Sequence, residues 1–184
     1  MQWYFDDAAE LDGYLDGLRF VACPMCGLVG ALVRHGRRFG WISRDERGVT
    51  GRRVFCDPDS PRDEGCGHAP SLYFSGRLKG RGFDTELLWL FIQVYMRTGS
   101  VRAAGRDPQV WLSLRTCYRL RDRFIAAQSV IRTNLCCRAP PAEQGKSAGS
   151  PLMQTLSHLH TAFNQCNPLS AYQHKLQREL LALS

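Results

Sequence analysis

The chain has 184 residues, 44% of them hydrophobic and 22% charged, which is the composition of an ordinary globular protein and excludes a disordered tail. No apolar run approaches the roughly 18 residues that cross a membrane, and the N-terminus lacks the basic start and apolar run of a secretory signal. We therefore expect a cytoplasmic protein without a membrane partner. Because disulfides are rare in that compartment, the eight cysteines are expected to be metal ligands or buried thiols.

The net charge of +7 is unevenly distributed along the chain. Residues 1–33 carry five carboxylates and one arginine, whereas residues 34–132 carry 19 basic and ten acidic side chains. Nearly all of these basic residues are arginines, whose planar guanidinium suits phosphates and guanine edges. Basic residues also often only solvate a surface, so charge alone does not identify a ligand.

The first 20 residues are predicted to form an acidic N-terminal helix. Phe5, Leu11, Leu15 and Leu18 recur at roughly helical spacing, which indicates a face that packs over the segment that follows. An alternative role for this helix is self-inhibition, in which its carboxylates cover a basic surface.

Residues 23–27 read CPMCG. A C-x2-C pair can be half of a zinc site, a thioredoxin-like redox couple or the start of a disulfide scaffold. Three β-rich runs follow, separated by turn signals, and they are predicted to be strands of a small sheet: GALVRHG, RRFGWIS and RRVFC. A redox couple would need a helix starting at the motif in a βαβ context, so the strands favour a metal site.

A second cysteine pair completes the predicted site. The third run ends at Cys56, and Cys66 follows after a polar loop, so residues 21–80 are expected to be a zinc ribbon. Zn²⁺ prefers four tetrahedral ligands, and with four protein ligands its role is structural. The second pair is spaced more widely than usual, and His68 is an alternative to one cysteine. The predicted zinc ligands are Cys23, Cys26, Cys56 and Cys66, and the expected buried or idle thiols are Cys117, Cys136, Cys137 and Cys166.

Residues 81–137 change to the helical period. Asp84 is a candidate N-cap for a helix that ends near Thr98 at Gly99, Ser100 can cap a short helix, and Ser113 can cap a long one. A short helix and turn before a long helix is the layout of a helix-turn-helix, although this turn is longer than the tightest form.

The long helix is predicted to have two different faces. Its apolar face comprises Cys117, Leu120, Phe124, Ala127, Ile131 and Leu135, and its opposite face Arg115, Arg119, Asp122 and Arg123. The charged face either meets a ligand or is a solvated surface with an Arg119–Asp122 ion pair.

The remaining chain is predicted to be a flexible linker over residues 138–151 and a helical hairpin over residues 152–184. Two apolar stripes indicate the hairpin: Leu152, Leu156, Leu159 and Phe163, then Leu169, Tyr172, Leu176, Leu180 and Leu183. They pack on the preceding helices or form a homodimer or protein-partner face. Residues 133–184 contain only two carboxylates, Glu143 and Glu179, whereas a two-metal nuclease needs converging acidic ligands, so we expect no nuclease or transferase core.

Several of these segments resemble the N-terminal zinc ribbon and helix-turn-helix of bacterial insertion-sequence transposases and related transposase-like zinc-ribbon proteins. They are CPMCGLVGALVRHG, GRRVFC with GCGHAPSLYF, and TGSVRAAG with LSLRTCYRLRDRF, within roughly residues 20–135. The resemblance implies that the four cysteines bind zinc and that the third helix reads the DNA ends of a mobile element. It also implies that catalysis belongs to a separate RNase H-like domain, and nothing resembling that domain follows.

Together these observations predict an α+β protein with a small zinc-ribbon β-sheet, a helix-turn-helix-like domain and C-terminal helices. The expected function is sequence-selective binding of double-stranded DNA, as a nucleoid-associated regulator or accessory factor of a mobile element. Predicted DNA contacts are Arg115, Thr116, Arg119 and Arg123 on the long helix and Arg37, Arg38, Arg52 and Arg53 on the ribbon strands.

Three alternatives remain open at this stage. One is a zinc-stabilised interaction module that docks a transposase or transcription complex. Another is a redox enzyme using Cys23 and Cys26, which requires a metal-free thiol of low pKa. The third is RNA binding, because arginines together with Phe39 and Trp41 also suit single strands.

Overall fold

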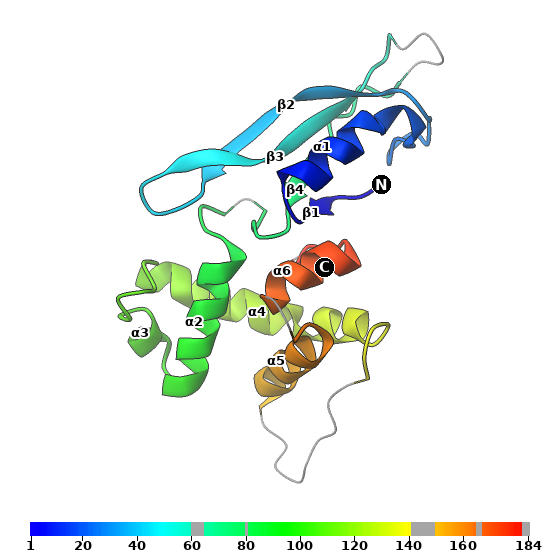
Figure 1. Ribbon diagram of the computed structural model, residues 1–184. Helices are drawn as coiled ribbons and strands as arrows, with labels where there is room; N and C mark the ends of the chain where they lie inside the picture. The colour runs from blue at the N-terminus through cyan, green and yellow to red at the C-terminus, as the bar shows by residue number, and fades with distance from the viewer. Residues whose placement is uncertain (60–64, 80, 141–149, 165–166, 182–184) are drawn as a thin grey trace. The chain divides into compact units, whose positions relative to one another are not determined.

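The fold is α+β, with the strands and most helices in separate parts of the chain (Figure 1). A computed structural model describes residues 1–59, 65–79, 81–140, 150–164 and 167–181. The chain divides into two compact units, Met1–Gly82 (unit 1) and Phe83–Ser184 (unit 2). Residues 141–149 of the predicted linker, with Glu143, Cys166 and Leu183, lie outside the described residues.

Unit 1 contains a four-stranded mixed sheet in the order β1-β4-β3-β2. The strands are β1 (Tyr4–Phe5), β2 (Leu32–Trp41), β3 (Arg47–Cys56) and β4 (Ser71–Phe74). β1 is parallel to β4, and the other two pairings are antiparallel. Two of the predicted strand runs form the single strand β2, because register shifts near Gly36 and Phe39 are bulges and do not end the pairing.

The N-terminal segment contains a helix that is shorter than predicted. α1 spans Ala8–Asp16, and the side chain of Asp7 caps it by accepting a hydrogen bond from the Glu10 amide. The prediction was wrong for Phe5, which lies in β1, and for Leu18, which lies in the 3₁₀ turn η1 (Leu18–Phe20). α1 runs beside the β2–β3 hairpin in Figure 1. The buried core of unit 1 comprises Phe5, Leu11, Leu15, Leu18, Cys23, Ala31, Leu32, Val54, Cys56 and Leu72.

Unit 2 is helical, with α2 (Thr85–Thr98), α3 (Val101–Ala104), α4 (Leu114–Leu135), α5 (Pro151–Ala162) and α6 (Pro168–Leu176). The predicted caps are confirmed. The side chains of Asp84, Ser100 and Ser113 each accept a hydrogen bond from a backbone amide in the first turn of their helix. α2 ends where Gly99 adopts a left-handed conformation with φ of +65°, which glycine adopts without strain.

The apolar faces predicted for unit 2 form its core. All six residues of the predicted α4 face are buried, and α4 packs against α5. Leu152, Leu156 and Leu159 of α5 are buried, as are Leu169 and Tyr172 of α6. The two C-terminal stripes therefore contribute to packing within their own unit. Among the described residues, no helix combines the length and apolar character needed to span a membrane.

The backbone of β4 approaches β3 closely at Gly51. A Cβ atom at this position would lie 2.1 Å from the backbone oxygen of Leu72, so no side chain fits. We expect Gly51→Ala to lower the free energy of unfolding by about 2–4 kcal/mol in urea titrations followed by circular dichroism.

Gly13→Ala is the matched control for that substitution. No atom lies within 4 Å of a Cβ placed at Gly13, which is inside α1, so alanine should stabilise by about 0.5–1 kcal/mol. Equal stability of the Gly51→Ala protein and the wild type would contradict the described strand spacing.

Candidate metal centre

The first cysteine pair lies on a tight turn held by backbone hydrogen bonds. The Cys23 amide donates to the oxygen of Leu28 at 2.8 Å, and the Gly27 amide donates to the oxygen of Cys23 at 2.9 Å. Gly27 has φ of +78°, a conformation that favours glycine. The Met25 amide lies 3.5 Å from Cys23 Sγ and donates to it. The CPMCG sequence thus forms a turn that directs an amide at a sulfur, as expected of a metal-binding knuckle.

The second cysteine pair repeats this hydrogen-bond pattern. The Cys56 amide donates to the oxygen of His68 at 2.9 Å, and the Gly67 amide donates to the oxygen of Cys56 at 3.0 Å. Gly67 has φ of +69°, and the Cys66 amide donates to Cys56 Sγ at 3.4 Å. The two knuckles are therefore equivalent in backbone geometry despite their different spacing.

The long spacing of the second pair is explained by a closure at the base of the intervening loop. The Gly65 amide donates to the oxygen of Asp57 at 3.1 Å, and the Asp57 amide donates to the oxygen of Ala31 at 2.8 Å. A Cβ at Gly65 would lie 2.2 Å from the Asp57 oxygen, so only glycine permits this approach. The chain leaves the knuckle and returns at nearly the same point, which keeps Cys66 beside Cys56.

The two knuckles bring four sulfur atoms together. The Sγ atoms of Cys23 and Cys66 are 3.7 Å apart, as are those of Cys26 and Cys56. All four lie within 4.8 Å of one another. A tetrahedron of metal–sulfur bonds of about 2.3 Å has an edge of about 3.8 Å, whereas a disulfide needs about 2.05 Å. The four cysteines can therefore hold one metal ion.

The sulfur environments differ between the members of each knuckle. Cys23 and Cys56 are buried, whereas Cys26 and Cys66 are exposed. Burial raises the pKa of Cys23, but hydrogen bonds from the Cys26 and Met25 amides and from neighbouring thiols lower it to about 7. For Cys56, burial is the largest cause and raises the pKa to about 12. Four crowded thiols cannot all ionise at neutral pH without a cation between them.

The same geometry argues against a redox couple of Cys23 and Cys26. The Cys23 sulfur lies 3.7 Å from that of Cys66, in the other knuckle, and a buried thiol is poorly placed for exchange with a substrate. His68 is exposed and contributes its carbonyl oxygen to the knuckle, while its ring lies outside the four-sulfur group.

Among the ribbon arginines predicted to bind DNA, two are engaged inside unit 1. The Arg38 guanidinium lies 4.9 Å from the centre of the Tyr73 ring and donates to Ser71 Oγ at 2.9 Å. Arg52 Nη2 lies 3.5 Å from Asp12 Oδ1 of α1. Arg37 and Arg53 are exposed and have no such partner within the described part of the chain.

On α4, three of the four predicted contacts, Arg115, Thr116 and Arg119, fall in the first two turns of the helix. Arg115 and Arg119 are exposed, and Arg123 is half-buried. Thr116 belongs to the cap, since its Oγ1 lies 2.8 Å from Ser113 Oγ. The Arg119–Asp122 pair of the solvated-surface alternative is not formed among the described residues, because Asp122 instead accepts from the neighbouring Arg121 at 2.6 Å.

Sequence reasoning also missed two arginine contacts, one between helical neighbours three residues apart and one between distant segments. The Arg121 guanidinium lies 5.2 Å from the centre of the Tyr118 ring, and Arg34 of β2 pairs with Asp16 of α1. The signal for the second contact was present in the opposite charges of residues 1–33 and the ribbon strands.

Comparisons with known proteins returned no match to any family model, and no significant match among curated proteins or solved structures. Function therefore has to be inferred from the residues themselves. Within the described ranges, the four cysteines are the group of His, Cys, Asp and Glu side chains whose ligand atoms converge closely enough to hold a metal ion.

The four-cysteine site predicts a metal stoichiometry. Protein purified without added metal should contain about one ion per chain by mass spectrometry, and Cys56→Ser should contain close to none, because three ligands bind far more weakly than four. Cys136→Ser is the control, since this exposed thiol lies outside the group and its loss should leave the metal content unchanged. A wild-type protein without metal would refute the site.

Acidification should release the metal and unfold unit 1. Metal binding depresses the pKa of the ligating thiols below the unfolded-state value, so its stabilisation is present above that value and is lost as the pH falls. We expect release between about pH 8 and about pH 5, measured with a metal-sensitive dye alongside circular dichroism. Retention of the ion by an unfolded unit 1 would contradict this coupling.

Proposed function

We propose that the chain is a zinc-stabilised double-stranded DNA-binding protein that acts as a regulator or accessory factor of a mobile element. The observation that carries this proposal is the exposed face at the start of α4. Leu114 and Tyr118 are 41% and 40% exposed there, and Arg115 and Arg119 have no ion-pair or hydrogen-bond partner within the described residues. An exposed, capped helix start with free arginines suits entry into a major groove.

The packing before α4 supports a helix-turn-helix-like role. A Cβ at Gly105 would lie 3.2 Å from Cys117 Sγ, so the end of α3 approaches α4 closely. Val110 and Leu112 are buried and anchor the turn between these helices. The turn is longer than in the tightest motifs, but buried anchors give it a defined path. In the proposal, α3 braces α4 while the first turns of α4 contact DNA.

Zinc is the ion that the donor set supports best. Four thiolates at tetrahedral spacing suit Zn²⁺ or a single iron ion, and four protein ligands leave no open position for a reactant. The proposed role is therefore structural, with a contribution on the order of 10 kcal/mol to the folding of unit 1. Visible absorption spectroscopy separates the two ions directly, since an iron–thiolate centre is coloured and a zinc centre is not.

The mobile-element role is supported by the sequence motifs alone. The segments that resemble transposase zinc ribbons include both cysteine knuckles and the start of α4. Exposed Arg37 and Arg53 on the hairpin supply sequence-independent phosphate contacts in this proposal. Nucleoid association would follow from such contacts.

A second candidate is an interaction module that docks a transposase or transcription complex. Large apolar side chains around the first knuckle favour it, because Phe20, Met25 and Val29 are 72%, 63% and 55% exposed. The C-terminal helices are an additional candidate surface for a protein partner or a homodimer. Stable copurification of one partner in the absence of DNA would favour this candidate.

DNA binding can be tested with a random-sequence duplex pool and fluorescence anisotropy. If about six phosphates are neutralised, log K should fall with log salt with a slope near about −5. On a duplex selected from this pool, replacing Arg115 and Arg119 together by alanine should weaken binding by about tenfold or more, since base contacts are worth about 1–3 kcal/mol each.

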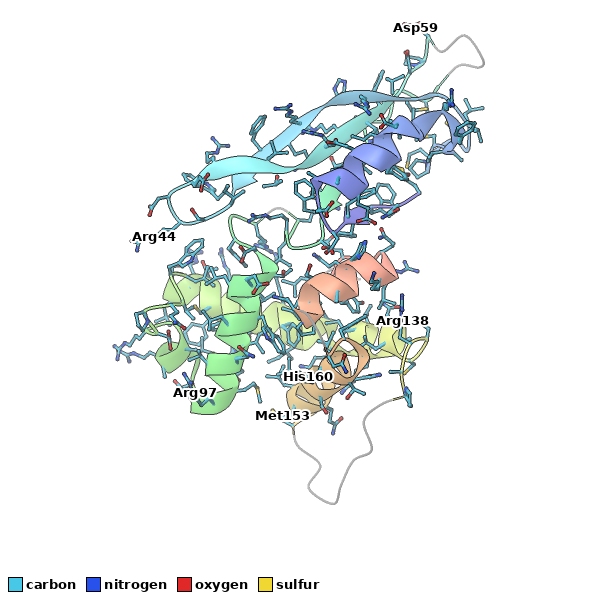
Figure 2. The ribbon with its side chains drawn as sticks, in the orientation of Figure 1. Arg44, Asp59, Arg97, Arg138, Met153 and His160 are labelled. Atoms are coloured by element: carbon cyan, nitrogen blue, oxygen red, sulfur yellow. The ribbon has the colours of Figure 1, made fainter. Side chains whose placement is uncertain are left out.

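The control variant replaces Arg138 and Arg178 by alanine, which removes the same charge from unit 2. Both side chains are exposed, and Arg138 follows the far end of α4 from Arg115, as labelled in Figure 2. Similar weakening in the two variants, or a salt slope near zero, would count against the proposed reading face.

A further inference from the structure

Unit 1 contains a second site candidate away from the metal centre. A cavity of about 220 Å³ lies between α1 and the β2–β3 hairpin, lined by Asp12, Leu15, Arg34, Gly36, Arg37, Arg52 and Arg53. We propose that this arginine pocket binds a phosphate group, and that Asp12 and Asp16 of α1 occupy its arginines when no phosphate is bound. The inference rests on the proposed function, because it specifies which ribbon residues bind phosphate and what competes for them.

The charge balance of the arginine pocket favours an anion. In the β2–β3 ladder, Arg37 is the direct partner of Arg52, and Arg53 is opposite Gly36. Like charges opposite one another destabilise a sheet unless something neutralises them. Only Arg34 and Arg52 have a carboxylate partner within the described residues, Asp16 and Asp12 respectively. Arg53 follows Arg52 in β3, so its side chain points to the other face of the sheet. The three guanidinium groups of Arg34, Arg37 and Arg52 against two carboxylates still leave an excess positive charge that a phosphate would offset.

Arg52 provides a second, independent observation. Its side chain is only 20% exposed, and its Nη1 atom is buried without a hydrogen-bond partner. Its Nη2 atom reaches Asp12 only at 3.5 Å, which is the long limit of a hydrogen bond. A buried donor left without a partner is unfavourable, and a phosphate oxygen would satisfy it. Gly36 leaves room for the ligand, since no atom lies within 4 Å of a Cβ placed there.

The carboxylates of α1 are weak enough to be displaced. The Arg34–Asp16 pair is open to solvent, with side chains 57% and 77% exposed, and exposed pairs contribute little stability. Phosphate carries more charge than a carboxylate and accepts forked hydrogen bonds from several guanidinium groups. Arg38 is not part of this set, because it is held by Tyr73 and Ser71. The acidic helix therefore acts as a built-in competitor for phosphate.

Charge removal from α1 tests the competition in the full-length, metal-containing chain. The Asp12→Asn/Asp16→Asn variant should bind the duplex pool about tenfold more tightly than wild type by anisotropy. The matched control is Asp45→Asn/Asp59→Asn, which changes the net charge equally. Figure 2 labels Asp59 and, at the other end of the hairpin, Arg44, the neighbour of Asp45. Neither Asp45 nor Asp59 lines the cavity. The control should gain no more than about twofold from general electrostatics.

A third variant adds Arg52→Gln to the Asp12→Asn/Asp16→Asn protein and should abolish the gain. Circular dichroism and metal content must match wild type in each variant, which excludes misfolding as the cause. Equal gains in the α1 variant and its control would overturn the arginine pocket, even if the Arg115 and Arg119 variant still shows that α4 binds DNA.

Inorganic phosphate and titration calorimetry distinguish the source of the phosphate group. Tighter duplex binding without measurable inorganic phosphate binding would support the arginine pocket with a nucleic-acid backbone as its ligand. Tighter binding of inorganic phosphate by the α1 variant, with no duplex binding by any variant, would support the pocket with a free phosphate and overturn the proposed duplex function. No gain for either ligand would overturn the pocket.

Discussion

The convergence of four sulfur atoms is the constraint on which unit 1 depends. Cys23 and Cys56 belong both to the sulfur group and to the buried apolar core, so metal binding and core packing are one assembly. Cys56 ends β3, where it pairs with Leu32 at the start of β2, so the sheet and the second knuckle fix each other. Without a cation, the raised pKa of Cys56 reflects the difficulty of burying a thiolate there.

Unit 2 is organised by local signals instead. Side-chain caps at Asp84, Ser100 and Ser113 begin its first three helices, and apolar faces at helical spacing bring α4 and α5 together. None of these interactions needs a metal. The chain thus combines one unit specified by contacts between distant segments with one specified by helix periodicity. The proposed DNA contacts on α4 consequently depend on the helix caps and apolar packing of unit 2. The proposed arginine pocket depends on the metal-stabilised folding of unit 1.

What the sequence could predict follows this division. Helix caps and buried helix faces were predicted because the residues that form them lie within a few positions of one another. The four cysteines were predicted because their spacing in the sequence is typical of metal ligands. β1 and β4 were missed, since they have two and four residues and their pairing joins Tyr4 to Tyr73 across the unit. The roles of Arg38 and Arg52 could not be predicted either, because their partners, Tyr73 and Asp12 respectively, are distant in sequence. Contacts between side chains that are far apart in the sequence produce no periodic pattern in the sequence.

The hydrogen-bonded closure between Asp57 and Gly65 makes the geometry of the four sulfur atoms independent of the length of the segment between these two residues. The hydrogen bond between the Gly65 amide and the Asp57 oxygen closes the loop between these residues. The conformational entropy lost on closing that loop therefore does not depend on the positions of the sulfur atoms. Each doubling of such a loop costs only about 0.6 kcal/mol, which is small beside the free energy of a structural metal. The second knuckle is thus a position where this protein can accept inserted sequence, such as a recognition peptide or a fused label, without rebuilding its centre.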